Sequence, residues 1–121
     1  MKSERPITIF CDIDGTLVKH NPPSIAANPN TKLEVLPGTI DKLNYWDSKG
    51  YNIILVTGRK ESMREVTEKQ LKEVGIFYDK LIMGIGGGKR VIINDKKPNN
   101  DGSTAESFCL DRNEGINNIN L

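Results

Sequence analysis

The sequence predicts an α/β protein, a three-layer sandwich in which helices cover a mainly parallel sheet. Three observations lead to this fold class. Short apolar runs alternate with helical segments, glycine and proline mark the joins, and polar residues stand where the apolar runs end. When single helices separate the strands, right-handed crossovers make those strands parallel neighbours in one sheet. At 121 residues the chain is expected to form one domain, residues 1–121.

The first half of the chain contains the clearest strands. Residues 7–13 (ITIFCDI) form an apolar run that only Asp12 interrupts, which is typical of a buried strand. Residues 19–32 hold three prolines and no helical period, so we expect a loop. Apolar side chains then recur on one face of residues 37–50, where glycine ends the predicted helix. Residues 51–57 (YNIILVT) follow as the strongest strand of the chain.

The second half continues the alternation. Residues 61–74 carry apolar side chains at helical spacing, and Gly75 suits the end of that helix. Three further strands are expected, at residues 80–83 and 90–94 and, on the edge of the sheet, at 105–110. The glycine run 84–88 lies between the first two of them. The asparagine-rich end, residues 115–121, is expected to fray.

Composition excludes several classes of protein. Seventeen Lys and Arg residues stand against sixteen Asp and Glu, and this balance is unlike that of a general nucleic-acid binder. No run approaches the ~20 apolar residues of a membrane span, and the first residues lack the apolar run of a signal peptide. We therefore expect a cytoplasmic protein with no membrane contact, in which Cys11 and Cys109 are reduced. The single histidine, His20, excludes a site built from several histidines.

Polar side chains gather at the carboxyl ends of the predicted strands. They are Asp12, Asp14 and Thr16 after the first strand, Thr57 and Arg59 after the second, and Asn94 and Asp95 after the last. In open α/β sheets, ligands bind outside this edge of the sheet. We therefore expect one functional site that combines the three groups.

The sequence Asp12-Ile13-Asp14 places two carboxylates on the same side of an extended chain. Two close anions repel each other unless a cation lies beside them, and Mg²⁺ prefers carboxylate and carbonyl oxygens. Gly15 permits a sharp turn, and Thr16 has a hydroxyl that can orient a carboxylate. The plain alternative is an Asp-Gly turn with a solvated Asp12. The position at the end of a buried strand favours the metal site.

These motifs resemble those of the haloacid-dehalogenase-like (HAD) superfamily. CDIDGTLV at 11–18 resembles its first signature, DxDx[TV], ILVTGR at 54–59 resembles the second, and VIINDKKP at 91–98 resembles the fourth. The resemblance covers about residues 7–98 and implies a Rossmann-like sheet. The short layout and the INDKKP ending also resemble small bacterial phosphatase-like proteins of surface-polysaccharide and sugar-nucleotide pathways.

The resemblance implies a role for each matching residue. Asp12 is expected to attack phosphorus and become an aspartyl phosphate, and Asp14 to protonate the leaving group and then deprotonate water. Thr57 is expected to hydrogen-bond a phosphoryl oxygen. Asp95 is expected to complete the Mg²⁺ site with the Asp12 carboxylate and the Asp14 backbone carbonyl.

The third signature, a lysine that steadies the phosphate, is ambiguous. Lys89 is the first choice as a catalytic residue, with Arg90 and Lys80 as the alternatives. Contacts with the substrate are expected from Gly15, Thr16, Gly58, Arg59 and Arg90, although Arg59 alternatively pairs with a helix acid such as Glu61. The glycine run is either a turn between strands or a backbone cradle for phosphate. Asn94 stands where many relatives have a second acid, and we expect it to weaken the surroundings of the metal rather than abolish binding.

The chain has no room for the cap that sets specificity in many relatives. Twenty residues separate Thr16 from Pro37, and thirty-seven separate Thr57 from Asp95. Either the substrate is large, or residues 19–36 act as a small flap, or a second subunit covers the site. The sequence thus predicts a Mg²⁺-dependent phosphatase for a small phosphorylated substrate, preferably a sugar phosphate. The alternatives are a nucleotide or nucleic-acid end phosphate, and an accessory domain that binds Mg²⁺ or phosphate in polysaccharide biosynthesis.

Overall fold

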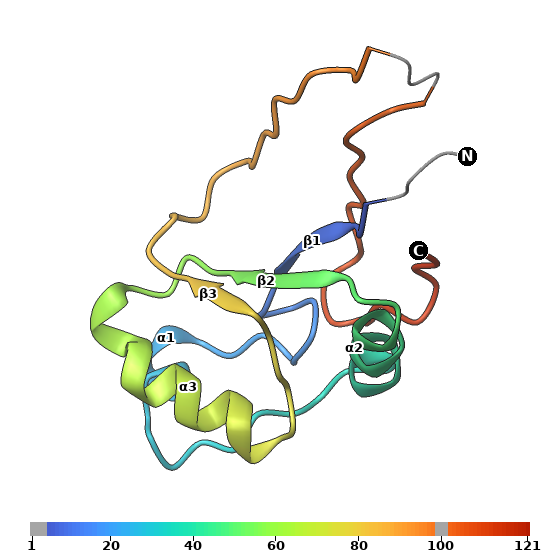
Figure 1. Cartoon of the computed structure of the whole chain (residues 1–121). Helices are drawn as coiled ribbons and strands as arrows, with labels where there is room; N and C mark the ends of the chain where they lie inside the picture. Colours follow the sequence, from blue (N-terminus) through green and yellow to red (C-terminus); the bar gives the residue numbers. More distant parts are fainter. Residues whose placement is uncertain (1–4, 99–101) are drawn as a thin grey trace.

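A parallel sheet organises the computed structural model, which describes residues 5–98 and 102–121 (Figure 1). Its strands are β1 (Thr8–Asp12), β2 (Asn52–Val56) and β3 (Lys80–Ile82), in the order β1-β2-β3. Cys11 lies beside Leu55, and Leu55 lies beside Leu81. All pairings between these strands are parallel, so their carboxyl ends share one edge. The predicted α/β class with a parallel sheet and no cap is confirmed.

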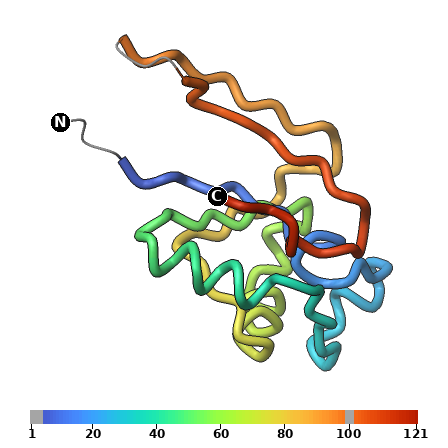
Figure 2. Tube along the Cα trace, turned by 90° about the vertical axis from the view of Figure 1, so that its right-hand side faces the viewer, coloured from blue at the N-terminus to red at the C-terminus, as the bar shows by residue number. Residues whose placement is uncertain are grey.

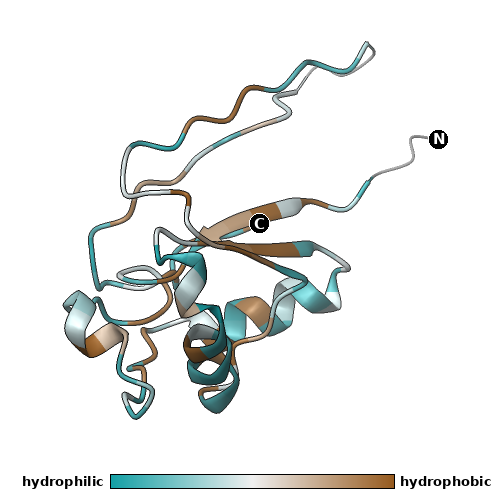
Figure 3. Cartoon of the chain, turned by 90° about the vertical axis from the view of Figure 1, so that its left-hand side faces the viewer, coloured by the Kyte–Doolittle hydropathy of each residue, from teal (hydrophilic) through white to brown (hydrophobic). Residues whose placement is uncertain are grey.

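The helices cover one face of that sheet (Figures 1 and 3). They are α1 (Pro23–Ala26), α2 (Thr39–Ser48), the short 3₁₀ turn η1 (Glu61–Met63) and α3 (Arg64–Glu73). The strand order explains the arrangement, because two right-handed crossovers in the same direction place α2 and α3 on the same side. On the other side Phe10 and Ile82 are exposed. A third layer does not form within the described part of the chain.

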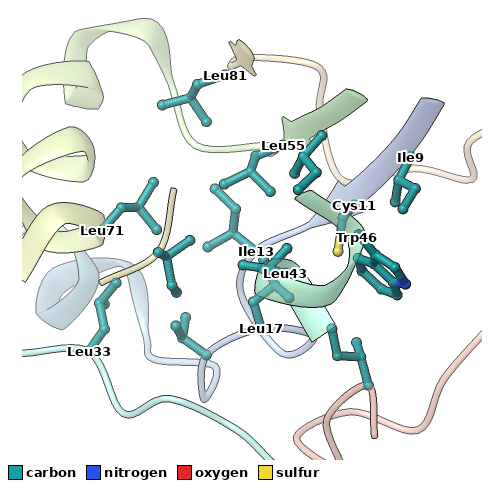
Figure 4. Close-up of a cluster of buried hydrophobic side chains, with 14 of the residues drawn as sticks. Ile9, Cys11, Ile13, Leu17, Leu33, Leu43, Trp46, Leu55, Leu71 and Leu81 are labelled. Carbon is teal, nitrogen blue, oxygen red and sulfur yellow. The ribbon is translucent and has the colours of Figure 1, made fainter. Parts of the chain in front are cut away.

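The hydrophobic core lies between the sheet and the helices (Figure 4). Residues of β1 and β3 alternate between this core and the open face, as the pleat of a strand requires, whereas Ile53, Ile54 and Leu55 of the central strand β2 are all buried. The core joins side chains from the three strands, α2, α3, the connecting segments and the C-terminal residues, namely Ile9, Cys11, Ile13, Leu17, Val18, Leu33, Leu43, Trp46, Ile53, Leu55, Leu71, Ile76, Leu81, Met83, Ile116 and Ile119. The expected fraying of residues 115–121 is wrong, because Ile116 and Ile119 are buried in this core.

Residues 88–98 and 102–110 leave the body as an extended arm (Figures 1 and 2). The strands expected at 90–94 and 105–110 are absent from it. Ile93, in the middle of the first, is 92% exposed. The two sides of the arm are joined by side-chain contacts, such as the 3.2 Å bond from Asn94 Nδ2 to the Thr104 carbonyl. The apolar residues of the arm favour a strand locally. A strand also needs a neighbouring strand with which it exchanges backbone hydrogen bonds, and among the described residues no strand pairs with the arm.

Residues 19–36, the proposed flap, are anchored at both ends. Val18 and Val35 form an antiparallel bridge, and Lys19 N–H donates to the Glu34 carbonyl at 2.8 Å. The short helix α1 lies inside this loop. Across the described ranges, no helix has the length and apolar content to cross a bilayer.

Candidate active site

The first site element is the turn that follows β1, which we call the catalytic turn (residues 12–18). The Ile13 carbonyl accepts bonds from the N–H groups of Thr16, Leu17 and Val18, and Gly15 adopts a φ of +88°, which suits glycine. Ile13 is fully buried. Because neighbouring residues of an extended chain point to opposite sides, Asp12 and Asp14 are directed away from the core.

Asp12 is bound by a cation and a hydroxyl. Arg90 Nη1 donates to its Oδ1 at 2.9 Å, and Thr16 Oγ1 donates to its Oδ2 at 3.2 Å. The carboxylate remains 34% exposed. In the structure, therefore, Arg90 rather than Lys89 stands at the predicted nucleophile. Lys89 is exposed, and Lys80 lies at the start of β3.

Asp14 has a different environment. Arg59 holds it through two bonds of 2.8 Å, from Nε to Oδ2 and from Nη2 to Oδ1. The Arg59 side chain is only 5% exposed, whereas Asp14 is 20% exposed. The alternative partner Glu61 instead pairs with Arg64. The structure thus pairs Arg59 with both carboxylate oxygens of Asp14, and the predicted contact of Arg59 with substrate stays a prediction.

Two further side chains complete this buried network, and the sequence reasoning missed both. Arg59 Nη1 donates to Thr67 Oγ1 at 3.0 Å and to Gln70 Oε1 at 2.7 Å. Gln70 Nε2 in turn donates to the carbonyls of Ala26 and Asn28, at 3.0 and 3.2 Å. Thr67 and Gln70 are fully buried. The available signal was two polar residues three apart beside Leu71, on the apolar face of a helix.

The second site element is the turn after β2. Thr57 is buried, and its Oγ1 accepts the Arg59 N–H at 3.0 Å. A side chain on Gly58 would place Cβ 2.9 Å from the Gly86 carbonyl oxygen, so glycine allows the two loops to approach. Ile85 N–H donates to the Thr57 carbonyl at 3.3 Å. The glycine run thus packs on the end of β2, which favours a turn over a phosphate cradle.

Asp95 is not brought to the two aspartates. It lies on the arm with its side chain 68% exposed and accepts a 3.0 Å bond from Lys97 Nζ, which lowers the pKa of that carboxyl below its usual range. Among the described residues, no three His, Cys, Asp or Glu side chains lie close enough together to hold a metal ion. The structure therefore joins Asp12 and Asp14 but leaves the third expected ligand apart. The cause is the missing strand at 90–94, whose carboxyl end was expected to bring Asp95 to the same edge of the sheet as Asp12 and Asp14.

The C-terminal residues form a third site element that the sequence analysis did not include. Asn113 N–H donates to the Gly15 carbonyl at 2.8 Å, and Asn113 Oδ1 accepts the His20 N–H at 2.8 Å. Arg112 lies against Gly15. Asn113 has a φ of +67°, which asparagine tolerates better than most residues. An asparagine and a glycine near a chain end, Asn113 and Gly115, could have indicated such a turn.

The two thiols differ in environment. Burial, with a smaller contribution from Asp12, raises the pKa of the Cys11 thiol to about 12. Cys109 is exposed. A thiol with so high a pKa is a poor nucleophile, and neither cysteine forms a disulfide. Cys11 therefore acts as a core residue.

The acid phosphatase family, subfamily IIIB of the HAD superfamily, matches residues 26–105, about two thirds of the chain. The chain belongs to this family. The membership confirms the predicted HAD superfamily. The matched segment includes Thr57, Arg59 and Asp95 and begins after the catalytic turn. No curated protein matches the chain.

Solved structures show the same fold. Two structures of the Pnkp1/Rnl/Hen1 RNA repair complex contain similar chains. The first is 31% identical over 64% of this chain and 25% of the other, with a TM-score of 0.54, and the second is 28% identical over 74% and 32%, with a TM-score of 0.57. A structural-genomics target from Vibrio cholerae is 17% identical over 95% and 90%, with a TM-score of 0.57. This chain thus spans a quarter to a third of the length of the RNA repair proteins.

Proposed function

We propose that this chain is a Mg²⁺-dependent phosphatase that hydrolyses a phosphomonoester through an aspartyl phosphate on Asp12. The observation that carries the proposal is that two carboxylates on one turn differ in their exposure and in their hydrogen-bond partners. Asp12 is one-third exposed, whereas Asp14 is fixed by a buried arginine. Each carboxylate is bound by an arginine, but Asp12 is the more exposed of the two and Asp14 is held through both oxygens by a buried guanidinium, which suits a division between nucleophile and acid–base group.

Asp12 is the proposed nucleophile. A carboxylate oxygen of Asp12 bonds to phosphorus while the bond from phosphorus to the alcohol oxygen breaks. Arg90 and Thr16 already bind the two oxygens of Asp12, at 2.9 and 3.2 Å, and fix its orientation. The positive charge of Arg90 also lowers the repulsion between an anionic carboxylate and an anionic ester.

Asp14 is the proposed acid and base. It gives a proton to the departing alkoxide and then takes one from the water that attacks the aspartyl phosphate, which restores the Asp12 carboxylate and releases inorganic phosphate. Both oxygens of Asp14 accept bonds from Arg59. Transfer of a proton at Asp14 therefore requires that one of these two bonds opens.

The donor set at the catalytic turn fits Mg²⁺. Asp12 attracts a cation in the structure, and Mg²⁺ is commonly held by one or two protein oxygens together with waters and substrate phosphate. The Asp12 carboxylate and the Asp14 backbone carbonyl would hold the ion, and Asp95 is the proposed third ligand, which requires it to leave Lys97. When bound, the ion supplies positive charge that stabilises the phosphoryl oxygens in the transition state.

The remaining contacts with the phosphoryl group are proposed for Thr57 and for the backbone of the two turns. Gly15, Thr16 and Gly58 lie on those turns. Lys89 and Arg90 supply positive charge at the base of the arm. We propose that residues 1–121 form one capless domain and that residues 19–36 act as its flap.

The substrate class that we propose first is a sugar phosphate, because the sequence resembles phosphatases of polysaccharide pathways. We propose that the protein acts in the cytoplasm. A nucleic-acid end phosphate is the second candidate, and the similarity to chains of an RNA repair complex favours it. The two candidates differ in the group that carries the phosphate, and the phosphoryl chemistry is common to both.

The test is phosphate release from a panel of sugar phosphates, nucleotides and 3′- or 5′-phosphorylated oligonucleotides, with Mg²⁺ and with EDTA. We expect release only with Mg²⁺, and a loss of at least about 10³-fold in Asp12→Asn, or ~4 kcal/mol of transition-state stabilisation. Asp41→Asn, which changes an exposed aspartate on α2, is the matched control. Release that survives Asp12→Asn contradicts the covalent mechanism, and no release from any substrate contradicts the enzymatic function.

The role of Asp95 is tested separately. Asp95→Asn is expected to raise the Mg²⁺ concentration that gives half-maximal activity by about tenfold, because one anionic oxygen is lost from the ion. If Asp95→Asn leaves the Mg²⁺ dependence as it is in the native chain, Asp95 is not a ligand, and the arm keeps the position that it has in the structure.

A further inference from the structure

The C-terminal segment, residues 111–119, packs against the catalytic turn and is hydrogen-bonded to it. Asn113 is held by Gly15 and His20. Ile116 N–H donates to the Pro37 carbonyl at 3.1 Å. Beyond these bonds, Ile116 and Ile119 are buried in the core. The segment is therefore anchored to the catalytic turn at Gly15 and to the chain after it at His20 and Pro37.

This anchoring fixes the position of Arg112. A Cβ atom built on Gly15 would lie 3.2 Å from Arg112 Cγ and 3.9 Å from both its Cδ and its Nε. The stem of Arg112 therefore runs across Gly15, in the space that a side chain would otherwise fill. Packing of the apolar stem against a glycine leaves the guanidinium free to face solvent, and Arg112 is exposed.

The guanidinium of Arg112 differs from the other two at the site. Arg90 is paired with Asp12, and Arg59 is paired with Asp14. Within residues 5–98 and 102–121, Arg112 forms no ion pair, although Asp111 and Glu114 are near it in sequence. Arg112 thus lies beside the catalytic turn with no partner acid among the described residues, and it makes no ion pair with Asp12 or Asp14.

We propose that Arg112 binds a second anionic group of the substrate, distinct from the phosphoryl group that is hydrolysed. This inference rests on the proposed function. The planar fork of a guanidinium matches the two oxygens of a phosphate or a carboxylate, and charge-assisted bonds of this kind are among the stronger polar contacts. A capless site has little surface with which to grip a small substrate, so an arginine beside the catalytic turn supplies selectivity for bisphosphates or for phosphorylated acids.

Matched pairs of substrates test the proposal. Fructose 6-phosphate is compared with fructose 1,6-bisphosphate, adenosine 3′-phosphate with adenosine 3′,5′-bisphosphate, and glycerol 3-phosphate with 3-phosphoglycerate. The quantity measured is the ratio of kcat/KM within each pair, which separates a second phosphate from a carboxylate. In the native chain we expect at least one pair to favour the doubly anionic member by about tenfold, as a charge-assisted contact predicts.

Arg112→Gln is expected to lower that ratio by about tenfold, through KM, and Arg112→Lys is expected to retain part of it. The control is Arg5→Gln, because Arg5 is exposed and lies before β1, at the opposite end of the strand from Asp12. A merely structural role would lower both members of a pair equally and leave the ratio unchanged. An unchanged ratio in Arg112→Gln therefore overturns the proposal.

Binding separates this proposal from the proposed function. In an Asp12→Asn background, which stops turnover, calorimetric titration with fructose 1,6-bisphosphate or adenosine 3′,5′-bisphosphate measures affinity alone. We expect about tenfold weaker binding after Arg112→Gln. Equal affinity with and without Arg112 refutes the inference, whether or not the native chain hydrolyses the compound. If the native chain hydrolyses none of the compounds but their binding still depends on Arg112, only the proposed enzymatic function is refuted.

Discussion

Replacing Arg59 by methionine tests the buried network at the site. Methionine keeps the unbranched apolar stem of the side chain but removes the guanidinium and every donor, so Asp14, Thr67 and Gln70 each lose a partner. Removal of one partner of a buried ion pair costs ~3–5 kcal/mol. Because Asp14 is one-fifth exposed, water offsets part of this cost, and we expect about 3 kcal/mol. For a domain of this size, that loss lowers Tm by about 10 °C.

Urea unfolding and thermal unfolding measure this effect. The urea m value should stay the same, because the surface exposed on unfolding hardly changes. The control is Arg64→Met, because Arg64 pairs with the exposed acids Glu61 and Glu68 on the helix surface, and exposed pairs of this kind contribute little to stability. A cycle with Asp14→Asn should give a coupling of about 2 kcal/mol. An Arg59→Met cost below ~1 kcal/mol, or a coupling near zero, refutes the reasoning.

Two other predictions follow from single positions. Gly115→Ala should lower the free energy of unfolding by at least about 2 kcal/mol in urea, since the new Cβ would lie 2.3 Å from the Pro37 carbonyl oxygen at a φ of +86°; a neutral substitution would mean that the C-terminal segment does not dock. At pH 8, a thiol reagent should modify only Cys109 in the folded protein and both cysteines in urea. Burial holds the pKa of Cys11 near 12, so its thiolate is scarce below that pH and grows only as the pH rises toward it. Rapid modification of Cys11 in the folded chain would contradict its burial.

The three strands of the sheet could be predicted because each one corresponds to a short apolar run in the sequence. Residues 52–56 form the second strand where the apolar run stands, and the helix predicted over 61–74 forms as η1 and α3. Asp12 and Asp14 share a turn because their separation in sequence is only two residues. For such elements, periodicity and a turn residue are enough to decide the structure.

The rest depends on contacts between distant segments. The pairing of Arg59 with Asp14 spans 45 positions and depends on how α3 is rotated, which no local pattern reveals. The apolar run at 90–94 suggested a strand, but a strand also depends on a neighbouring strand. The asparagines after Gly115 suggested disorder, and the two isoleucines among them, Ile116 and Ile119, were not recognised as core residues. Their spacing of three residues lets both enter the core.

The docking of the C-terminal segment has a consequence for the order of folding. Asn113 binds His20 across 93 positions of sequence, and contacts of such separation form slowly, since a long loop must close first. The catalytic turn is among the first parts of the chain in sequence, yet the Gly15 carbonyl in that turn gains its hydrogen bond from Asn113, almost a hundred positions later. We therefore expect the turn to reach its final shape late in folding, together with the domain as a whole. A partly folded chain would then present Asp12 and Asp14 before Arg112 has docked beside Gly15.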